Sequence, residues 1–581
     1  MFYRASKPVH NSISHIIFAL FGKDRVIRQK LIRPERTKKR SVMKLTFIGA
    51  DHEVTGSQHL IETQDLKILV DCGMEQGKNI YENAELPCSY KEIDYILLTH
   101  AHIDHSGMIP SAYVNGFNGT VLCTQASKDL DEIMLLDSAH IQEMEAEFAN
   151  RKGKRAGLEP VKPEYTVEDA KHVIECFKDV PYGQITELSD TVKVRFIDAG
   201  HLLGSASIEM WIKEGDIEKK IVFSGDIGNS DKPIIKDPTY ITGGADYVLM
   251  ESTYGSRFHE KGIDHIEDLA RIIQQTLDRK GNVVIPAFAV GRTQELLYLI
   301  KQIKDQKLVK GHDGFPVYVD SPLAVEATNV FMNAPLECFD DDFMSLIEKG
   351  INPISFPELT LSVSTEESTA INFNPVPKVI LAAAGMCNAG RIRHHLKHNL
   401  WRPECTVVFA GYQAEGTLGR VLQDEIDSVR LFGEEINVAA HIETMRDMSS
   451  HADQHELVEW ATKLGKVNGR MFLVHGDDEA METLSGLVRE ATGNVVDCPF
   501  SGSVFDLAED KWITQTEGIP YKKPEKAVTP QSAKVISLNS QLDDAMEILM
   551  KQVRSVQNGT NADKRKLATE ILRLAKKYSY D

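Results

Sequence analysis

Short apolar runs recur along the chain from Met43 onward, and each ends at a polar residue. Runs of this length between polar positions are typical of buried strands. The clearest runs lie at residues 45–48, 68–70, 95–98, 221–223, 247–250, 283–285, 317–319, 379–381, 407–409 and 471–474. Helical spacing of apolar residues separates many of the later runs, for instance across 293–303. This alternation predicts an α/β fold with parallel sheet.

Two later segments depart from that pattern. Residues 137–180 are polar with helical spacing, and they predict an inserted helical excursion with a loop over 151–163. Residues 517–536 contain Pro and Lys and predict a linker. The apolar positions that follow it predict a C-terminal helical hairpin: Leu542, Ala545, Met546, Leu549, Val553, Val556, Leu567, Ile571, Leu574 and Tyr578. This hairpin packs either on the body or on a second subunit, so a homodimer stays open.

The first 42 residues are strongly basic. They are rich in Lys and Arg, with only Asp24 and Glu35 as acids, whereas the whole chain carries a formal net charge of −19. A nucleic-acid-binding arm, a targeting segment, a disordered tail and sequence ahead of a natural start at Met43 are the alternatives. We favour a disordered basic extension over residues 1–42.

Composition narrows the class of protein. The chain has 581 residues, of which 42% are hydrophobic and 26% charged, as in ordinary globular proteins. No apolar run has the length of a membrane-spanning helix, so no membrane partner is expected. Eight scattered cysteines without a CxxC pair favour a reducing, cytoplasmic compartment. The acidic balance disfavours indiscriminate nucleic-acid binding and leaves room for a local basic groove.

The strongest chemical signal is the sequence HAHIDH at residues 100–105, directly after a predicted strand. Three imidazoles and a carboxylate are costly to keep in a core, whereas both groups suit zinc. With their i, i+2 spacing His100 and His102 can reach one ion, and Asp104 and His105 can turn to a second. We therefore interpret this run as metal-binding rather than structural.

The sequence HAHIDHSG resembles the HxHxDH signature of the metallo-β-lactamase fold. The other ligand positions of that fold occur in order at strand ends, as Asp71 in LVDCG, His201 in DAGHLLGS and Asp226 in FSGDIG. Taken singly, each would be explained as a turn residue, a loop histidine or a cap. Together and in this order they indicate the metal site that the resemblance implies.

The downstream half resembles the β-CASP subfamily, whose members process nucleic acids. Glu251 in MESTYG, His451 in SSHAD and His475 in LVHGD look like its motifs A, B and C. Four further stretches are also similar to it: PAFAVGRTQELL (286–297), DSPLA (320–324), AAAGMCNAGRIRHHLKH (382–398) and GYQAEGTLGR (411–420). The motif C histidine, which Artemis-type DNA nucleases lack, points to RNA. The pattern is most similar to bacterial exoribonuclease-like members and to the pre-mRNA cleavage nuclease.

The resemblance implies a metallo-β-lactamase αββα sandwich with an inserted β-CASP α/β domain and a C-terminal helical tail. The lactamase domain would take residues 43–254 and 441–505, and the β-CASP domain 255–440. Residues 506–581 would hold the linker and hairpin. Single-stranded RNA would enter the cleft between the two domains.

The resemblance also implies a site with two Zn²⁺, although Mn²⁺ and Fe suit the same ligand types. The first zinc takes His100, His102 and His201, and the second takes Asp104, His105 and His475, with Asp226 between them. Asp71 would orient ligand imidazoles from behind. His451 is the expected general acid, held by Glu251. The expected RNA contacts are Gly385, Gly390, Arg391, Arg393, His395, Lys397 and Arg292.

The function expected from this resemblance is hydrolysis of single-stranded RNA by a two-metal hydroxide mechanism, leaving 5′-phosphate and 3′-hydroxyl ends. Exonuclease and endonuclease action both stay open. One alternative is a small-molecule metallo-hydrolase of thioesterase or lactonase type, against which the inserted domain and the Glu251–His451 pair argue. The other is a non-catalytic RNA-binding scaffold, against which the complete ligand set argues.

Overall fold

The computed structural model describes residues 42–521, apart from 78, 79 and 261, and near the C-terminal end residues 549, 553, 564–569, 571 and 573. The predictions for residues 1–41, for the linker beyond 521 and for most of the C-terminal hairpin lie outside the described residues. Residues 564–569, within the expected second tail helix, are helical. In the described part of the chain, no helix is both long and apolar enough to cross a membrane.

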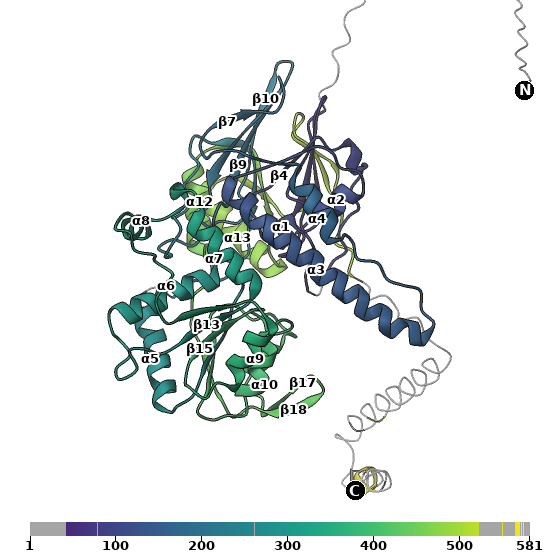
Figure 1. Ribbon diagram of the computed structural model, residues 1–581. Helices are drawn as coiled ribbons and strands as arrows, with labels where there is room; N and C mark the ends of the chain where they lie inside the picture. Colours follow the sequence, from purple (N-terminus) through teal and green to yellow (C-terminus); the bar gives the residue numbers. More distant parts are fainter. Residues whose placement is uncertain are drawn as a thin grey trace, which may run out of the picture. The chain divides into compact units, whose positions relative to one another are not determined.

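Two large sheets pack face to face (Figure 1). The eight-stranded sheet has the order β23-β22-β1-β2-β3-β4-β5-β6, with β1 Lys44–Gly49, β2 Gln58–Glu62, β3 Lys67–Val70, β4 Tyr95–Leu97, β5 Thr120–Cys123, β6 Phe177–Asp179, β22 Val504–Asp506 and β23 Lys511–Thr514. The seven-stranded sheet has the order β21-β20-β11-β10-β9-β8-β7, with β7 Ile185–Glu187, β8 Val192–Asp198, β9 Ala206–Glu214, β10 Ile217–Phe223, β11 Ala245–Glu251, β20 Val467–Val474 and β21 Val495–Asp497. Phe47 of β1, Phe223 of β10 and Phe472 of β20 share one hydrophobic core between them.

Helices cover the outer face of each large sheet. Leu135 packs with Ile96 of β4 on the first, and Trp460 packs with Val248 of β11 on the second. The helices of the first layer are α1 Ile103–Ser106, α2 Ile109–Val114, α3 Gln125–Ala156 and α4 Val167–Ile174, and those of the second are α12 Gln454–Leu464 and α13 Asp478–Thr492. The four layers form the expected αββα sandwich.

The helical excursion is longer and more continuous than predicted. Helix α3 runs through residues 151–156, where we predicted the start of a loop. Its first turn is capped by Thr124, whose hydroxyl accepts from the backbone N–H of Ser127, and it ends at Gly157 with a φ of 69°. The sequence RKGKRA at 151–156 contains good helix formers and one Gly, so the helix continues until a residue that adopts the left-handed conformation.

The inserted domain is built on a third sheet of six parallel strands. Its order is β14-β13-β15-β12-β16-β19, with β12 Val283–Pro286, β13 Val317–Asp320, β14 Leu359–Ser362, β15 Val379–Ala382, β16 Thr406–Phe409 and β19 His441–Thr444. Helices α5 His265–Asp278, α6 Arg292–Asp305, α7 Pro322–Asn333 and α8 Asp341–Glu348 contribute to one of its cores. Helices α9 Thr365–Phe373, α10 Ile392–Asn399 and α11 Leu418–Gln423 contribute to the other. A separate hairpin consists of β17 Ser428–Leu431 and β18 Glu434–Asn437.

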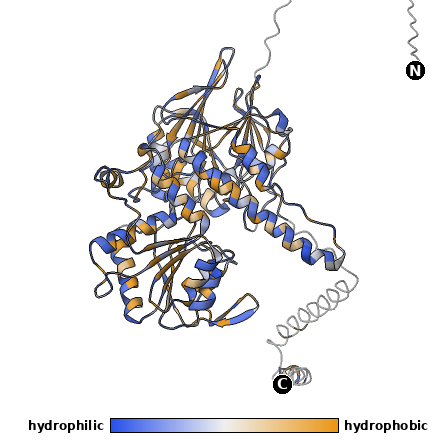
Figure 2. Ribbon diagram, in the orientation of Figure 1, coloured by the Kyte–Doolittle hydropathy of each residue, from blue (hydrophilic) through white to orange (hydrophobic). Residues whose placement is uncertain are grey.

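The covering helices are amphipathic, as α5 illustrates. It buries Leu269, Ile272, Ile273 and Leu277, which recur at the spacing of one helix face. Asp264 caps its first turn by accepting from two backbone N–H groups. Figure 2 shows the resulting mixture of hydrophilic and hydrophobic residues along the helices that cover the sheets. Burial of the apolar face therefore fixes each helix on its sheet.

Two predicted domain boundaries differ from the structure. Strand β19 pairs in parallel with β16, so residues 441–444 belong to the inserted sheet and not to the resumed lactamase domain. Strand β23 pairs with β22, so the lactamase domain extends beyond residue 505. Both strands lie at sheet edges and have few buried residues, so no apolar run distinguished them.

The carboxyl-terminal edge of the inserted sheet meets the lactamase domain. Ala289 and Val290, in the loop after β12, share a hydrophobic core with Leu202 and Leu203. A Cβ atom on Gly291 would lie 3.4 Å from the Leu202 side chain. Because Leu202 follows His201, this edge lies beside the candidate metal ligands.

Candidate active site

Parallel strands bring the predicted ligands to one end of the two packed sheets. Strands β3 and β4 are parallel neighbours, and so are β10, β11 and β20. The carboxyl ends of such strands meet at the same edge, whatever the separation of the strands along the chain. The residues at or just after these strand ends are Asp71, His100, Asp226, Glu251 and His475.

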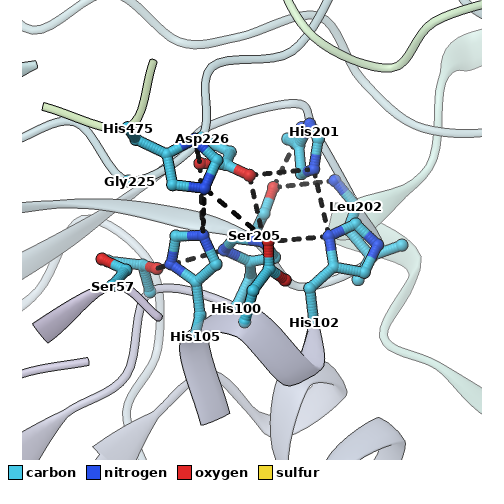
Figure 3. Close-up of polar contacts among 12 residues, drawn as sticks. Ser57, His100, His102, His105, His201, Leu202, Ser205, Gly225, Asp226 and His475 are labelled. Carbon is cyan, nitrogen blue, oxygen red and sulfur yellow. Dashed lines mark hydrogen bonds and ion pairs between the residues drawn. The ribbon is translucent and has the colours of Figure 1, made fainter. Parts of the chain in front are cut away.

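Three histidines form the first cluster (Figure 3). The Nε2 atom of His100 lies 3.0 Å from Nδ1 of His102, and Nε2 of His201 lies 3.3 Å from that same Nδ1 atom. The Oδ2 atom of Asp226 lies 3.4 Å from Nε2 of both His100 and His201. These four ligand atoms all lie within 4.8 Å of one another. His100 and His201 are buried, so solvent does not separate the nitrogens.

A second cluster lies on the other side of Asp226. The Nε2 atoms of His105 and His475 are 3.2 Å apart, and Oδ2 of Asp104 lies 3.7 Å from Nε2 of His475. Oδ1 of Asp226 lies 3.4 Å from Nε2 of His105. Asp226 thus turns one oxygen toward each cluster.

The donor set fits divalent metal ions. The ring nitrogens converge on one another and on the carboxylate of Asp226, as the ligands of a metal ion do. Oδ1 of Asp226 is buried and has no hydrogen-bond partner among the described residues. A buried carboxylate oxygen of this kind is costly unless a cation or donor compensates it. Imidazole and carboxylate are the usual ligands of catalytic divalent metals.

Hydrogen bonds to the second nitrogen of the imidazole rings hold these rings in position. Nδ1 of His105 lies 2.8 Å from Oδ2 of Asp71, and the Thr99 hydroxyl lies 3.1 Å from Nδ1 of His100. Asp71 in turn accepts from the backbone N–H and the hydroxyl of Thr99. Such partners select the tautomer that leaves the other ring nitrogen free for a metal.

Our sequence analysis missed three of these outer contacts. Besides Thr99, they are Thr253, whose hydroxyl lies 3.0 Å from Nδ1 of His475, and the Ser450 carbonyl, which lies 3.3 Å from Nδ1 of His201. Each lies within two residues of one that we had singled out: Thr99 precedes His100, Thr253 follows Glu251 by two positions and Ser450 precedes His451. A hydroxyl or carbonyl carries no distinctive sequence signal, so only the geometry finds them.

Replacing Asp71 by Asn should weaken metal binding by about 10- to 100-fold, because the amide removes the charge that orients His105. Competition with a chromophoric chelator measures the affinity directly. Asp313, an exposed acid in the loop before β13, provides the matched control as Asp313→Asn. Wild-type metal affinity in the Asp71→Asn protein would show that Asp71 does not orient His105 for metal binding.

Close backbone packing holds Asp104 and His105 in place. The N–H groups of Cys72 and Met74 donate to the carbonyls of His105 and Ile103. Between them, a Cβ atom on Gly73 would lie 1.7 Å from the carbonyl oxygen of Asp104. No other side chain fits without moving this segment.

Gly73→Ala should therefore lower the free energy of unfolding by about 1–3 kcal/mol, the usual cost of overpacking. It should also displace Asp104 and weaken metal binding. Urea denaturation measures the first effect and chelator competition the second. Gly314→Ala is the control, because a Cβ atom there meets nothing within 4 Å. Equal stability of the two variants would contradict the packing argument.

Glu251 and His451 form a third group next to the clusters. Nδ1 of His451 lies 3.2 Å from both carboxylate oxygens of Glu251. Glu251 is itself fixed, since it accepts from the backbone N–H of Ile227 at 2.5 Å. Burial lowers the pKa of His451, but the carboxylates of Glu251 and Asp226 outweigh burial and raise the pKa to about 9. The other ring nitrogen, Nε2, lies 3.9 Å from Oδ2 of Asp226 and so faces the clusters.

Most of the predicted RNA-binding side chains make contacts within the protein. Arg391 pairs with Asp320 at 2.7 Å, Lys397 pairs with Glu434 at 2.6 Å and Arg292 pairs with Glu295. Arg393 lies over the ring of Phe432, with 4.9 Å between its guanidinium carbon and the ring centroid. The basic run is thus largely neutralised within the inserted domain.

His395 does not match our prediction. Its side chain is fully buried, with Nε2 2.7 Å from Asp320 and Nδ1 2.9 Å from Asn372. It therefore makes contacts inside the inserted domain and is not available to RNA. Gly390 has a φ of 78°, and a Cβ atom there would lie 2.3 Å from the Ala383 carbonyl. A Cβ atom on Gly385 would lie 3.1 Å from the ring of Phe288. The two glycines serve close backbone packing in this loop.

Comparisons with known proteins agree with this architecture. Family models match a metallo-β-lactamase superfamily domain at residues 60–244, a β-CASP domain at 293–422 and a Zn-dependent metallo-hydrolase RNA specificity domain at 435–499. Ribonuclease TTHA0252 of Thermus thermophilus is 35% identical, over 77% of this chain and 96% of its own. An RNase J-like protein of Methanocaldococcus jannaschii is 30% identical, over 74% and 92%. Transcription termination factor FttA of Methanosarcina mazei is 31% identical, over 79% and 70%.

The matches cover nearly the whole length of the first two relatives. The three family models also follow one another in the same order as the three parts of the fold. The two ligand clusters combine residues from the first matched region with His475 from the third. The chain therefore belongs to the β-CASP family of metallo-β-lactamase nucleases, and it is a metal-dependent hydrolase that acts on RNA.

Proposed function

We propose that the protein is a zinc-dependent ribonuclease that hydrolyses single-stranded RNA and leaves 5′-phosphate and 3′-hydroxyl ends. When bound, two divalent ions would supply Lewis acidity and an activated water for in-line attack on phosphorus. Zinc fits the mixed imidazole and carboxylate donors best, with manganese and iron as alternatives. The residues that would hold the ions are His100, His102 and His201 for the first, Asp104, His105 and His475 for the second, and Asp226 for both.

The Glu251–His451 pair is the observation that carries this proposal. In phosphodiester hydrolysis the ribose oxygen leaves as an alkoxide, which needs a proton, and His451 would supply it from Nε2, the ring nitrogen that faces the clusters. Glu251 keeps the ring oriented by accepting from its Nδ1–H. A small-molecule hydrolase would need neither this pair nor an inserted domain, so we place that alternative second.

The test is a time course on single-stranded RNA labelled at the 5′ end in one tube and at the 3′ end in another. Early release of a labelled mononucleotide from one end identifies an exonuclease and its direction, whereas internal fragments identify an endonuclease. Chelator should stop the reaction, and single-stranded DNA should be cut far more slowly. Intact RNA after incubation with zinc-loaded protein would overturn the proposal, and thioester and lactone substrates would then be tested.

A cytoplasmic location is part of the proposal. All eight cysteines are free, and most of them are buried. Unpaired cysteines are typical of proteins from reducing compartments. A homodimer through the C-terminal hairpin stays a prediction, which the molecular mass in solution tests.

A further inference from the structure

We propose that Arg257 and Tyr412 form a nucleotide subsite next to the candidate active site. The Arg257 guanidinium would hold a backbone phosphate, and the Tyr412 ring would stack on a base. The subsite depends on the proposed ribonuclease function and names the residues that hold the strand beside the bond that is cut. It also gives a task to the stretch GYQAEGTLGR, which the metal ligands and the His451–Glu251 pair leave unused.

A continuous series of rings and one cation leads away from His451. The Tyr254 ring lies 6.1 Å from the His451 ring, measured between centroids. The guanidinium carbon of Arg257 lies 6.0 Å from the Tyr254 centroid and 5.6 Å from the Tyr412 centroid. Arg257 follows β11 in the lactamase domain, whereas Tyr412 follows β16 in the inserted domain. Both domains therefore contribute to this surface, and it begins at the group that would protonate the leaving oxygen.

The guanidinium of Arg257 is available to a ligand. It is exposed, and its guanidinium has no carboxylate partner within the described part of the chain. By contrast, Arg391 pairs with Asp320 and Arg446 pairs with Glu260. An arginine held between aromatic rings and free of counter-charge keeps its donors available for a planar, bidentate contact with phosphate.

Tyr412 is exposed but stands on a fixed loop. Tyr412 is 52% exposed, whereas the next residue, Gln413, is only 4% exposed. Nε2 of Gln413 donates to the carbonyls of Gly385 and Tyr412, both at 3.1 Å. A Cβ atom on Gly419 would lie 1.7 Å from the Gln413 amide oxygen, so the glycine there makes room for this brace. An exposed aromatic ring on a braced loop loses little entropy when a base stacks on it.

The chemistry of the pair selects single strands. A base can stack on Tyr412 only if it has left its own stack, as bases do in single-stranded RNA. Stacking is tolerant of sequence because every base has a flat face, and the phosphate contact does not read sequence either. The subsite would therefore give affinity and position without base preference.

The experiment compares KM and kcat of zinc-loaded Tyr412→Ala, Tyr412→Phe and Arg257→Ala on single-stranded RNA. Tyr412→Ala should raise KM about tenfold and change kcat less than about threefold, because a lost stack weakens binding without touching the reacting atoms. Tyr412→Phe should keep the wild-type KM. Trp401→Ala is the matched control: Trp401 is 57% exposed and precedes β16, so it lies at the opposite end of the strand that Tyr412 follows.

A second arm locates the stacked base. Oligonucleotides carry a single abasic nucleotide that is moved along the strand. One position should raise the wild-type KM about tenfold, and that penalty should vanish in Tyr412→Ala. Arg257→Ala should weaken binding and reduce the slope of log affinity against log salt by about one phosphate contact, which Arg257→Lys should restore in part.

Failure of this subsite and failure of the ribonuclease proposal give different results. If wild-type protein cuts RNA but Tyr412→Ala keeps its KM and no abasic position matters, the subsite is wrong and the ribonuclease stands. If no RNA is cut, fluorescence anisotropy of labelled RNA on zinc-loaded protein still compares the variants. Weaker binding by Tyr412→Ala and Arg257→Ala, but not by Tyr412→Phe or Trp401→Ala, would then support the subsite, and equal binding by all variants would overturn it.

Discussion

Asp226→Asn should lower kcat/KM for RNA cleavage by at least about a thousandfold. Asp226 turns one oxygen toward each ligand cluster, at 3.4 Å from His100 and His201 on one side and from His105 on the other. The amide keeps the shape of the side chain but removes the negative charge that both ions would share. Metal ions contribute several kcal/mol to such reactions, and about 4 kcal/mol corresponds to a thousandfold change in rate.

The metal content of the purified variant shows whether this loss has the expected cause. Elemental analysis by mass spectrometry should find fewer than two zinc ions per Asp226→Asn chain. Asp313→Asn should keep both the metal and the activity, since Asp313 is an exposed loop residue. An Asp226→Asn protein that binds two zinc ions and cuts RNA at the wild-type rate would contradict the shared ligand.

His451→Ala should lower kcat on RNA by about 100- to 10,000-fold while leaving the metal content unchanged. The range is that of a lost general acid, and the reason is that no other group would protonate the leaving 3′-oxygen. His451 is near both clusters but belongs to neither set of converging nitrogens, so its removal should not release metal. Glu251→Gln should show a smaller loss, because the ring then keeps its place but loses the carboxylate that favours its protonated form.

A substrate with a good leaving group separates proton donation from other effects of His451. The nitrophenolate of bis(p-nitrophenyl) phosphate leaves without a proton. The loss in His451→Ala should therefore shrink to less than about tenfold on this diester. A loss as large as that on RNA would mean that His451 positions the phosphate or the metals instead of donating a proton.

The strands and the ligand clusters were predictable because two simple signals coincide. Apolar runs marked the buried strands, including β4, β10 and β20, and polar residues directly after them marked the sheet edge. Asp226 and His475 follow parallel strands of the seven-stranded sheet, whose carboxyl ends meet at one edge. His100 follows β4 of the eight-stranded sheet, and the packing of the two sheets brings it to the same site. The order of the motifs then supplied the family, which the domain matches confirm.

The remaining features depend on partners that the local sequence does not reveal. Arg391 and His395 looked like a basic surface, yet both are held by Asp320, which lies 71 and 75 residues away along the chain. Strand β19 has no fully buried residue, and only its pairing with β16 assigns it to the inserted sheet. Helix α3 continues to Gly157 because nothing before that residue stops it. In each case a tertiary contact or a weak local signal decided the outcome.

The most direct test of the central claim is a metal titration of chelator-treated protein, with cleavage of single-stranded RNA followed at each step. We expect no cleavage by metal-free protein and full activity only as the second equivalent of zinc binds, because the two clusters would act together through Asp226. Full activity without metal, or intact RNA with two equivalents bound, would contradict it.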